Sequence, residues 1–357
     1  MLPPRKGRPQ GIALVIVMVV IFTLSVLAAG FSYSMKVETK LARNVSYESD
    51  LLWLGRSGVE LARYVLAQQL RVPNENSFDS LNQKWAGGPG STNDLLMDIS
   101  LEDNELGLGR FSVEIEDLER KININLAPPE LVERVLERLG CDTRETSIIV
   151  DSLVDWKDSN EETLLNGAET EDYLHEDTPH GPHAAKNGAI DDLEELLLVR
   201  GVTPELFWGS GRLSATGQEA ERIGTPLAAA GQGLGLVDVF SAAGASQVNL
   251  NTASAEVLAL LPGMDEQLAA EVVRLRAGLD CVDGTEDDTP LINAGELISV
   301  PGMLPQYVDA LRNFCGVRSY LYRVRVYVEL AQYQRCYVAL LQRQNERSVF
   351  VVQSYWE

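Results

Sequence analysis

Basic residues are scarce in this chain. It carries 52 acidic residues against 30 lysines and arginines, which gives a formal net charge of -22 at pH 7. Proteins that bind nucleic acids neutralise phosphates with lysine and arginine, so this balance argues against a nucleic-acid partner. It favours a solvated surface, a loop that binds cations, or a basic protein partner.

Cysteine is sparse as well, and no two cysteines form a CxxC pair. This spacing argues against a zinc site or a thioredoxin-type site. In an oxidising compartment four cysteines permit three disulfide pairings, and buried free thiols are the alternative. The sequence does not separate these possibilities for Cys141, Cys281, Cys315 and Cys336.

Recognisable catalytic motifs are also missing. No serine stands in a nucleophile elbow, and no glycine-rich loop carries the lysine of a P-loop. The histidines His175, His180 and His183 share one loop, without a nearby cysteine and without the spacing of ligands on one helix face. We therefore expect a protein that is not an enzyme.

The N-terminal region does contain a long apolar run. From Ile12 to Phe31 the chain is uncharged, and a stretch of about 20 residues matches the hydrocarbon thickness of a bilayer. This run is longer than that of a cleavable signal peptide. Apolar residues then recur at near-helical spacing up to Pro73, which predicts one helix of almost sixty residues. Basic residues before the run predict a cytoplasmic N-terminus.

The junction between Gly11 and Ile12 resembles the prepilin peptidase site of type IV pilins and pseudopilins. Cleavage after Gly11 would leave the apolar helix as the new N-terminus. Most of that superfamily has a glutamate at the fifth mature position, where this chain has Ile16. The departure either argues against a pilin or indicates the one pseudopilin that typically lacks this glutamate. A plain uncleaved anchor is the alternative.

The remainder of the sequence predicts an α+β fold. Residues 110–117 alternate apolar and polar positions like a strand, and residues 235–240 are also strand-like. Each is followed by an Asn-containing segment, a helix and a glycine stop. We interpret the similar segments ININ and VNLN as an internal structural repeat. Three segments from Tyr320 onward, rich in β-branched and aromatic residues, predict consecutive antiparallel strands.

Three turns in the helical part place a glycine between apolar residues, at Gly201, Gly263 and Gly302. They resemble the helix-hairpin-helix motif, which in many proteins binds DNA phosphates. Asp265 stands where the DNA-binding form usually has a second glycine, and Glu266 follows it. Because carboxylates repel phosphate, we interpret these turns as structural.

An acidic loop follows Val154 and holds a dense mixture of carboxylates and amides, the ligands that Ca²⁺ prefers. A solvated disordered loop is the alternative. Trp156 and Tyr173 within the run favour an ordered loop. A second, weaker calcium candidate lacks full EF-hand spacing and comprises Asp280, Asp283, Asp287 and Asp288.

Several motifs together make the chain resemble general secretion pathway protein K, a family of minor pseudopilins of type II secretion systems. They are KVETKLARN, LVDWKDSN, NGAETEDY, KNGAIDDLEELLLVRGVTPELFWG and VNLNTASAEVLALLPG. The resemblance implies a pilin-like α/β body with a large inserted α-helical domain, located at the tip of a periplasmic pseudopilus. It also implies a structural calcium ion, with Asp155, Asp158, Glu169 and Asp172 as ligands and Asn187 as a weaker candidate.

The implied partners are the minor pseudopilins I and J, the prepilin peptidase and the inner membrane, with most of the chain in the periplasm. A minor pilin of a type IV pilus and a membrane-anchored DNA-uptake protein are the competing interpretations. The expected division, in order, is a prepilin leader (1–11), a transmembrane helix (12–31), its continuation (32–72), the first part of the pilin-like body (73–121), the inserted helical domain with the acidic loop (122–234), a second, repeat-like helical segment (235–318) and the C-terminal antiparallel strands (319–357).

Overall fold

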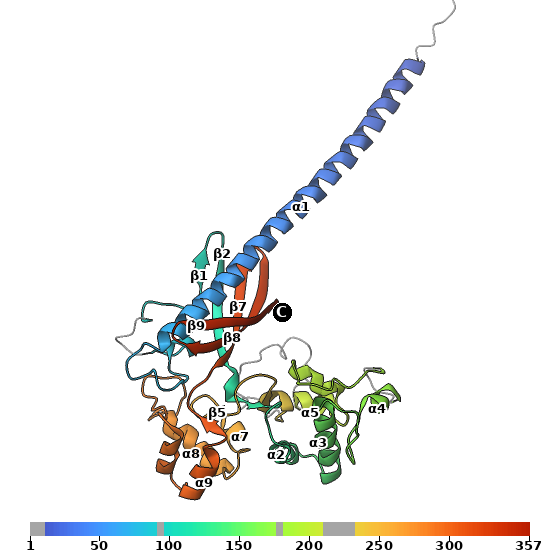
Figure 1. Cartoon of the computed structure of the whole chain (residues 1–357). Helices are drawn as coiled ribbons and strands as arrows, with labels where there is room; N and C mark the ends of the chain where they lie inside the picture. The colour runs from blue at the N-terminus through green and yellow to red at the C-terminus, as the bar shows by residue number, and fades with distance from the viewer. Residues whose placement is uncertain (1–10, 91–95, 176–180, 210–232) are drawn as a thin grey trace, which may run out of the picture.

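The N-terminal helix dominates the outline of the molecule (Figure 1). The computed structural model describes residues 11–90, 96–175, 181–209 and 233–357. Helix α1 (Gly11–Gln69) has 59 residues, which confirms the predicted single long helix. Its first half projects away from the rest of the chain, and none of its apolar window is buried. Within the described residues it is the one helix that is long and apolar enough to cross a membrane, which makes it a candidate anchor.

The second half of α1 packs against a five-stranded antiparallel sheet, which confirms the predicted α+β body. Between Leu51 and Leu66 the helix buries leucines, valines and Ala62 against the inner face of the sheet. The strands have the spatial order β1 (Asn104–Leu106), β2 (Gly109–Asp117), β7 (Leu321–Leu330), β8 (Tyr333–Asn345) and β9 (Ser348–Trp356). The last three are consecutive hairpin-connected strands, as the C-terminal pattern predicts.

Close contact between α1 and the sheet depends on a glycine. A Cβ atom built on Gly58 would lie 2.3 Å from Cγ1 and 2.8 Å from Cγ2 of Val326 on β7. Glycine inside a helix normally costs about 1 kcal/mol relative to alanine, so a packing requirement outweighs propensity at this position.

We expect Gly58→Ala to lower the stability of the chain by about 1–3 kcal/mol, because the new methyl group overpacks a stiff valine. Thermal unfolding of the full chain in detergent measures the change. The neighbouring Ser57→Ala is the matched control and should be nearly neutral. A Gly58→Ala variant that melts above the parent would show that helix propensity, not packing, decides at this site.

A helical region is inserted between β2 and β7 and lies at the end of the body remote from the N-terminus of α1 (Figure 1). A single cluster of buried apolar side chains runs through it from Ile122 to Cys315. Two short parallel strand pairs connect distant segments of the region. They are β3 (Ile122–Asn123) with β4 (Phe240–Ser241) and β5 (Val248–Asn249) with β6 (Cys315–Gly316). Its helices are α2 (Pro129–Arg138), α3 (Thr143–Lys157), α4 (Thr170–His175), η3 (Leu193–Leu198), α5 (Pro204–Trp208), α6 (Leu236–Val239), α7 (Ala255–Leu258), α8 (Glu266–Arg276), η5 (Ala294–Ser299) and α9 (Pro305–Leu311). Two further 3-10 turns, η1 (Lys84–Ala86) and η2 (Leu118–Arg120), belong to the segments that flank the sheet.

The two halves of the helical region repeat the same hydrogen bonds. Asn125 exchanges a pair of bonds with the backbone of Ile190, at 2.8 and 2.9 Å. Asn251 makes the same exchange with the backbone of Leu291, with both bonds at 2.9 Å. In each half the Asn side chain joins the start of the unit to the segment before a 3-10 helix. The predicted internal repeat is therefore present in the structure.

The predicted strand at residues 235–240 is wrong for most of its length. Leu236 to Val239 form helix α6, and only Phe240 and Ser241 are extended, as β4. The carboxylate of Asp238 accepts the backbone N–H of Gly235 at 3.0 Å, which caps a helical turn. Leu236 and Val239 are both buried, and this spacing of three residues suits one helix face.

In each of the three predicted turns the glycine has a left-handed backbone, with φ of +87° at Gly201, +80° at Gly263 and +89° at Gly302. Asp265 has a structural task in the second of these turns. Its carboxylate accepts the backbone N–H of Leu268 at 2.8 Å and caps α8. That N–H is therefore not available to a phosphate.

A buried polar network joins the body to the helical region. Arg343 of β8 pairs with Asp79, and the side chain of each is almost fully buried. Asp117, at the end of β2, accepts hydroxyl hydrogen bonds from Ser319 at 2.6 Å and Thr252 at 2.5 Å. Burial raises the pKa of Asp117. Burial and the charge of Asp117 together raise the pKa of Glu119 to about 8.

Candidate metal centre

Three of the predicted calcium ligands converge at the C-terminal end of α3. Asp155 lies in the last turn of this helix, Asp158 follows its last residue, and Glu169 stands just before α4. One carboxylate oxygen of each lies within 4.8 Å of those of the other two. The loop between Asp158 and Glu169 therefore returns to the helix that it left.

Glu169 is the most informative member of this group. Its side chain is almost fully buried, with 2% of the residue surface exposed. Both carboxylate oxygens lie inside the protein without a hydrogen-bond partner among the residues described. Burial and the nearby charge of Asp155 raise its pKa to about 7. A buried carboxylate without a partner is costly, and a cation between these oxygens would remove that cost.

Asp155 is fully buried and holds the returning loop as well as facing Glu169. Its carboxylate accepts the backbone N–H of Leu164 at 3.1 Å. Burial is the main cause of its raised pKa. A Cβ on Gly167 would lie 1.9 Å from Oδ2 of Asp155, so glycine is required for the loop backbone to come this close. Sequence reasoning did not identify Gly167, because its role depends on a contact with the preceding helix.

The other two predicted ligands lie in supporting positions. Oδ2 of Asp172 accepts the backbone N–H of Glu169 at 3.0 Å, so this carboxylate orients the segment that carries Glu169. Asn187 has a left-handed backbone with φ of +50°, and its amide donates to Oε1 of Glu161 at 2.9 Å. Oδ1 of Asn187 is buried and has no hydrogen-bond partner in the described part of the chain. It is therefore a further oxygen with capacity to bind a cation.

Aromatic side chains hold the acidic loop in an ordered arrangement. The rings of Trp156 and Tyr173 meet edge to face, with centroids 5.4 Å apart. The ring of His183 lies 4.9 Å from that of Tyr173, and its two nitrogens face the carbonyl oxygens of Gly181 and Leu198. In the described part of the loop, this packing agrees with the ordered loop that Trp156 and Tyr173 predict. His175 is exposed at the end of α4, and His180 lies outside the described residues.

At the second calcium candidate, hydrogen bonds to the loop backbone and an ion pair already occupy the carboxylates. Asp283 forms an ion pair with Arg276 at 2.7 Å. The other three accept backbone N–H groups of the same loop: Asp280 from Val282, Asp287 from Leu279 and Asp280, and Asp288 from Gly284. In the part of the chain that the structure describes, these four do not form a group with converging free oxygens.

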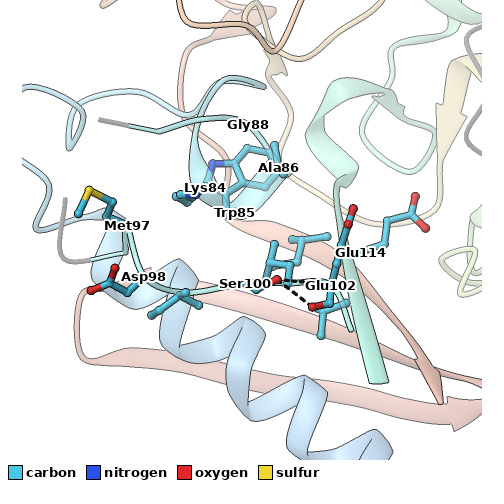
Figure 2. Close-up of a pocket in the computed structure, with 14 residues that line it drawn as sticks. Lys84, Trp85, Ala86, Gly88, Met97, Asp98, Ser100, Glu102 and Glu114 are labelled. Atoms are coloured by element: carbon cyan, nitrogen blue, oxygen red, sulfur yellow. Dashed lines mark hydrogen bonds between the residues drawn. The ribbon is translucent and has the colours of Figure 1, made fainter. Parts of the chain in front are cut away.

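A pocket of the described structure lies away from these carboxylates, on the sheet body (Figure 2). It has a volume of about 580 Å³ and lies between the turn at Lys84, the segment 97–102 and strand β2. Its lining contains neither histidine nor cysteine. The acidic side chains of Asp98 and Glu114 lie on opposite sides of it. Ser100, the serine of this lining, exchanges hydrogen bonds with the backbone of Glu102 and not with an acidic or basic side chain.

Comparison with known proteins agrees with the sequence motifs. Residues 110–208 match the family described as type II secretion system (T2SS), protein K. Relatives named type II secretion system protein K are 26% identical over 209 residues in Pseudomonas aeruginosa, 24% over 216 in Aeromonas hydrophila and 25% over 219 in Klebsiella pneumoniae. The matched regions cover 55–57% of this chain and 58–62% of the relatives. These names are those of secretion components, not of enzymes.

The same fold occurs in a crystal structure of the GspK-GspI-GspJ complex from the type 2 secretion system of enterotoxigenic Escherichia coli. The TM-score is 0.62 at 16% sequence identity, and the superposition covers 88% of this chain and 99% of that chain. The fold, the family match and the named relatives agree with one another. Residues 110–208 carry the family domain of type II secretion system protein K, and the chain is similar to proteins of that name over just over half of its length.

Proposed function

We propose that this chain is a minor pseudopilin at the tip of the type II secretion pseudopilus, where it assembles with the minor pseudopilins I and J. The observation that carries the proposal is the division of α1 into two halves. One half is apolar and unpacked, and the other is fixed into a sheet that carries an additional helical region. Such a helix suits a subunit that leaves the bilayer and packs among the helices of its neighbours.

The exposed half of α1 needs an apolar environment. Leu14, Phe22 and Phe31 are each more than 60% exposed, and the whole stretch carries no charge. Lipid covers such a surface before assembly, and neighbouring helices cover it afterwards. We propose that the basic leader holds the N-terminus in the cytoplasm until prepilin peptidase cuts between Gly11 and Ile12, and that the body and the helical region lie in the periplasm.

Two features favour the terminal position in the assembly. Ile16 is apolar and cannot accept the N-terminal amine of a subunit stacked above it. The helical region lies at the end of the body opposite the N-terminus of α1, where it would obstruct the next subunit (Figure 1). If steric obstruction alone decides the position, an Ile16→Glu variant still occupies the tip.

We propose a structural role for calcium in this assembly. Asp155, Asp158 and Glu169 would hold the ion, with Asn187 as a further oxygen donor. Ca²⁺ would supply the positive charge that these buried carboxylates lack and would fix the acidic loop on α3. The role is non-enzymatic, and the proposed partners are proteins of the secretion machinery, not nucleic acid.

Deletion and complementation test the functional proposal. Loss of the gene should stop export of type II substrates across the outer membrane, and the wild-type chain should restore it. Twitching motility and adhesion, which depend on type IV pili, should not change. Normal export in the deletion strain together with a loss of pili would favour the minor-pilin alternative. DNA binding by the purified chain in a gel-shift assay would favour the DNA-uptake alternative.

A further inference from the structure

Strand β9 leaves one edge of the body sheet open. At the opposite edge, β1 has only three residues, carries Glu105 and follows Asp103, and short charged edges of this kind resist pairing with other chains. β9 has nine residues, SVFVVQSYW, without a charge or a proline. A long uncharged edge is a template for another strand.

The backbone of β9 is oriented for such pairing. Glu357 donates its backbone N–H to the carbonyl of Cys336 at 3.0 Å, and Trp356 lies opposite Tyr337. Hydrogen-bonding direction alternates along an antiparallel strand, so the backbone groups of Trp356 and Ser354 face away from β8. No described strand pairs with that side of β9. Near its start the carbonyl of Val349 accepts a hydrogen bond from Nε of Arg63 on α1 at 2.9 Å, so the edge offered to a partner is the part from Val351 to Trp356.

The side chains of β9 are also apolar where they meet solvent. Phe350, Val351, Val352 and Tyr355 are between 42% and 60% exposed. Val352 has no partner on β8, because the register shifts between Leu340 and Leu341. Adjacent residues of a strand point to opposite faces, so apolar groups are exposed on both sides of this edge. A contiguous surface of this kind is typical of a protein interaction site.

We propose that β9 binds an edge strand of a neighbouring minor pseudopilin, which extends the body sheet by one strand. The inference rests on the proposed function and identifies a surface through which the assembly forms. Main-chain hydrogen bonds would supply affinity, and the apolar side chains on both faces would supply specificity. The partner strand is expected to be apolar in its centre.

The proposed terminal position favours a different protein over a second copy of this chain, because a subunit at the tip has the minor pseudopilins I and J as neighbours. Charge does not select the partner, since each end of β9 carries both signs. Arg347 follows Glu346 at its start, and Glu357 follows Trp356 at its end, where Arg335 lies 5.8 Å from the centroid of the Trp356 ring.

Photo-crosslinking in the full chain tests this contact. A photoreactive amino acid replaces Val352, and the chain is co-expressed with the minor pseudopilins I and J of the same organism. We expect a crosslink to a strand of one of these partners, located by mass spectrometry. The same probe at Leu108, in the turn beside β1 and 89% exposed, is the control and should give no such product.

Two substitutions test the hydrogen bonds and the apolar surface separately. Ser354→Pro removes an outward N–H without removing a bond to β8, and Ser354→Ala is the matched control because both lose the hydroxyl that accepts from Tyr337 at 2.9 Å. We expect about tenfold less partner to copurify with Ser354→Pro and an unchanged amount with Ser354→Ala. Val352→Lys leaves the hydrogen bonds between β8 and β9 intact and should reduce the copurifying partner by a similar factor. If the proline variant unfolds, this second variant tests the docking edge.

The outcomes separate this inference from the function on which it rests. If wild-type chain recovers pseudopilins I and J and the β9 variants do so equally well, the docking edge is wrong and the proposed function stands. A crosslink between two copies of this chain would overturn the choice of partner. Failure of the wild-type chain to recover either pseudopilin would overturn both.

Discussion

Chelation of calcium is expected to lower the melting temperature of the full chain by about 5–10 °C. A ligand present at a hundred times its dissociation constant stabilises a protein by about 2.7 kcal/mol, and 1 kcal/mol corresponds to about 2–4 °C for a domain of this size. The expected effect is large because Glu169 and Asp155 are buried close together without a balancing cation. Thermal unfolding in detergent, with calcium and then with chelator, measures it.

The variant Glu169→Gln sharpens this test, because it should reverse the order of stability. In chelator it removes an unpaired buried carboxylate, so the variant should melt above the wild type. In calcium it removes a ligand, so the variant should melt below the wild type. Glu171→Gln, two residues away and exposed on α4, is the control and should keep the full calcium response. Identical melting curves of the wild type in calcium and in chelator would remove the calcium proposal.

Arg343→Met is expected to destabilise the chain by about 3–5 kcal/mol, because it leaves a buried acidic group without its cation. Arg343 is 2% exposed, donates to Asp79 and to the carbonyl of Ser319, and lies 5.0 Å from the centroid of the Tyr322 ring. Its loss would leave Asp79 facing Asp117, so the junction between the body and the helical region should loosen first.

Urea unfolding followed by tryptophan fluorescence measures this effect, since Trp85 packs against Tyr322 beside the network. Arg347→Met, at an exposed arginine in the β8–β9 turn, should change stability by less than about 0.5 kcal/mol. The double variant Arg343→Met with Asp79→Asn should recover part of the loss, because the uncompensated charge is gone. A loss below about 1 kcal/mol for Arg343→Met would show that the pair is not a main support of the junction.

Much of the fold follows from local sequence patterns. Short stretches of sequence encode the long helix α1, the three C-terminal strands and the repeated Asn-containing units. Hydrophobic periodicity therefore identifies these elements, and glycine and proline mark where they end. Helix α6 is the exception, because a run of only four residues, three of them apolar, fits a strand as well as a helical turn. The cap from Asp238 to Gly235 decides between them.

The ligands of the candidate metal centre were predictable, but the glycine that supports them was not. Asp155, Asp158, Glu169 and Asn187 stand in motifs that can be identified from sequence, whereas Gly167 matters through a contact that only folding creates. The same reason hides the pair of Asp79 and Arg343, which are separated by 264 residues. No periodicity or spacing rule connects positions so far apart.

The N-terminus of the mature chain gives the most direct test of the account. Mass spectrometry of the native protein from membranes, with and without prepilin peptidase, determines where the chain begins. The proposed assembly role predicts a chain that starts at Ile12 when the peptidase is present and retains the basic leader when it is absent. A chain that still carries Arg5, Lys6 and Arg8 in both strains would contradict it.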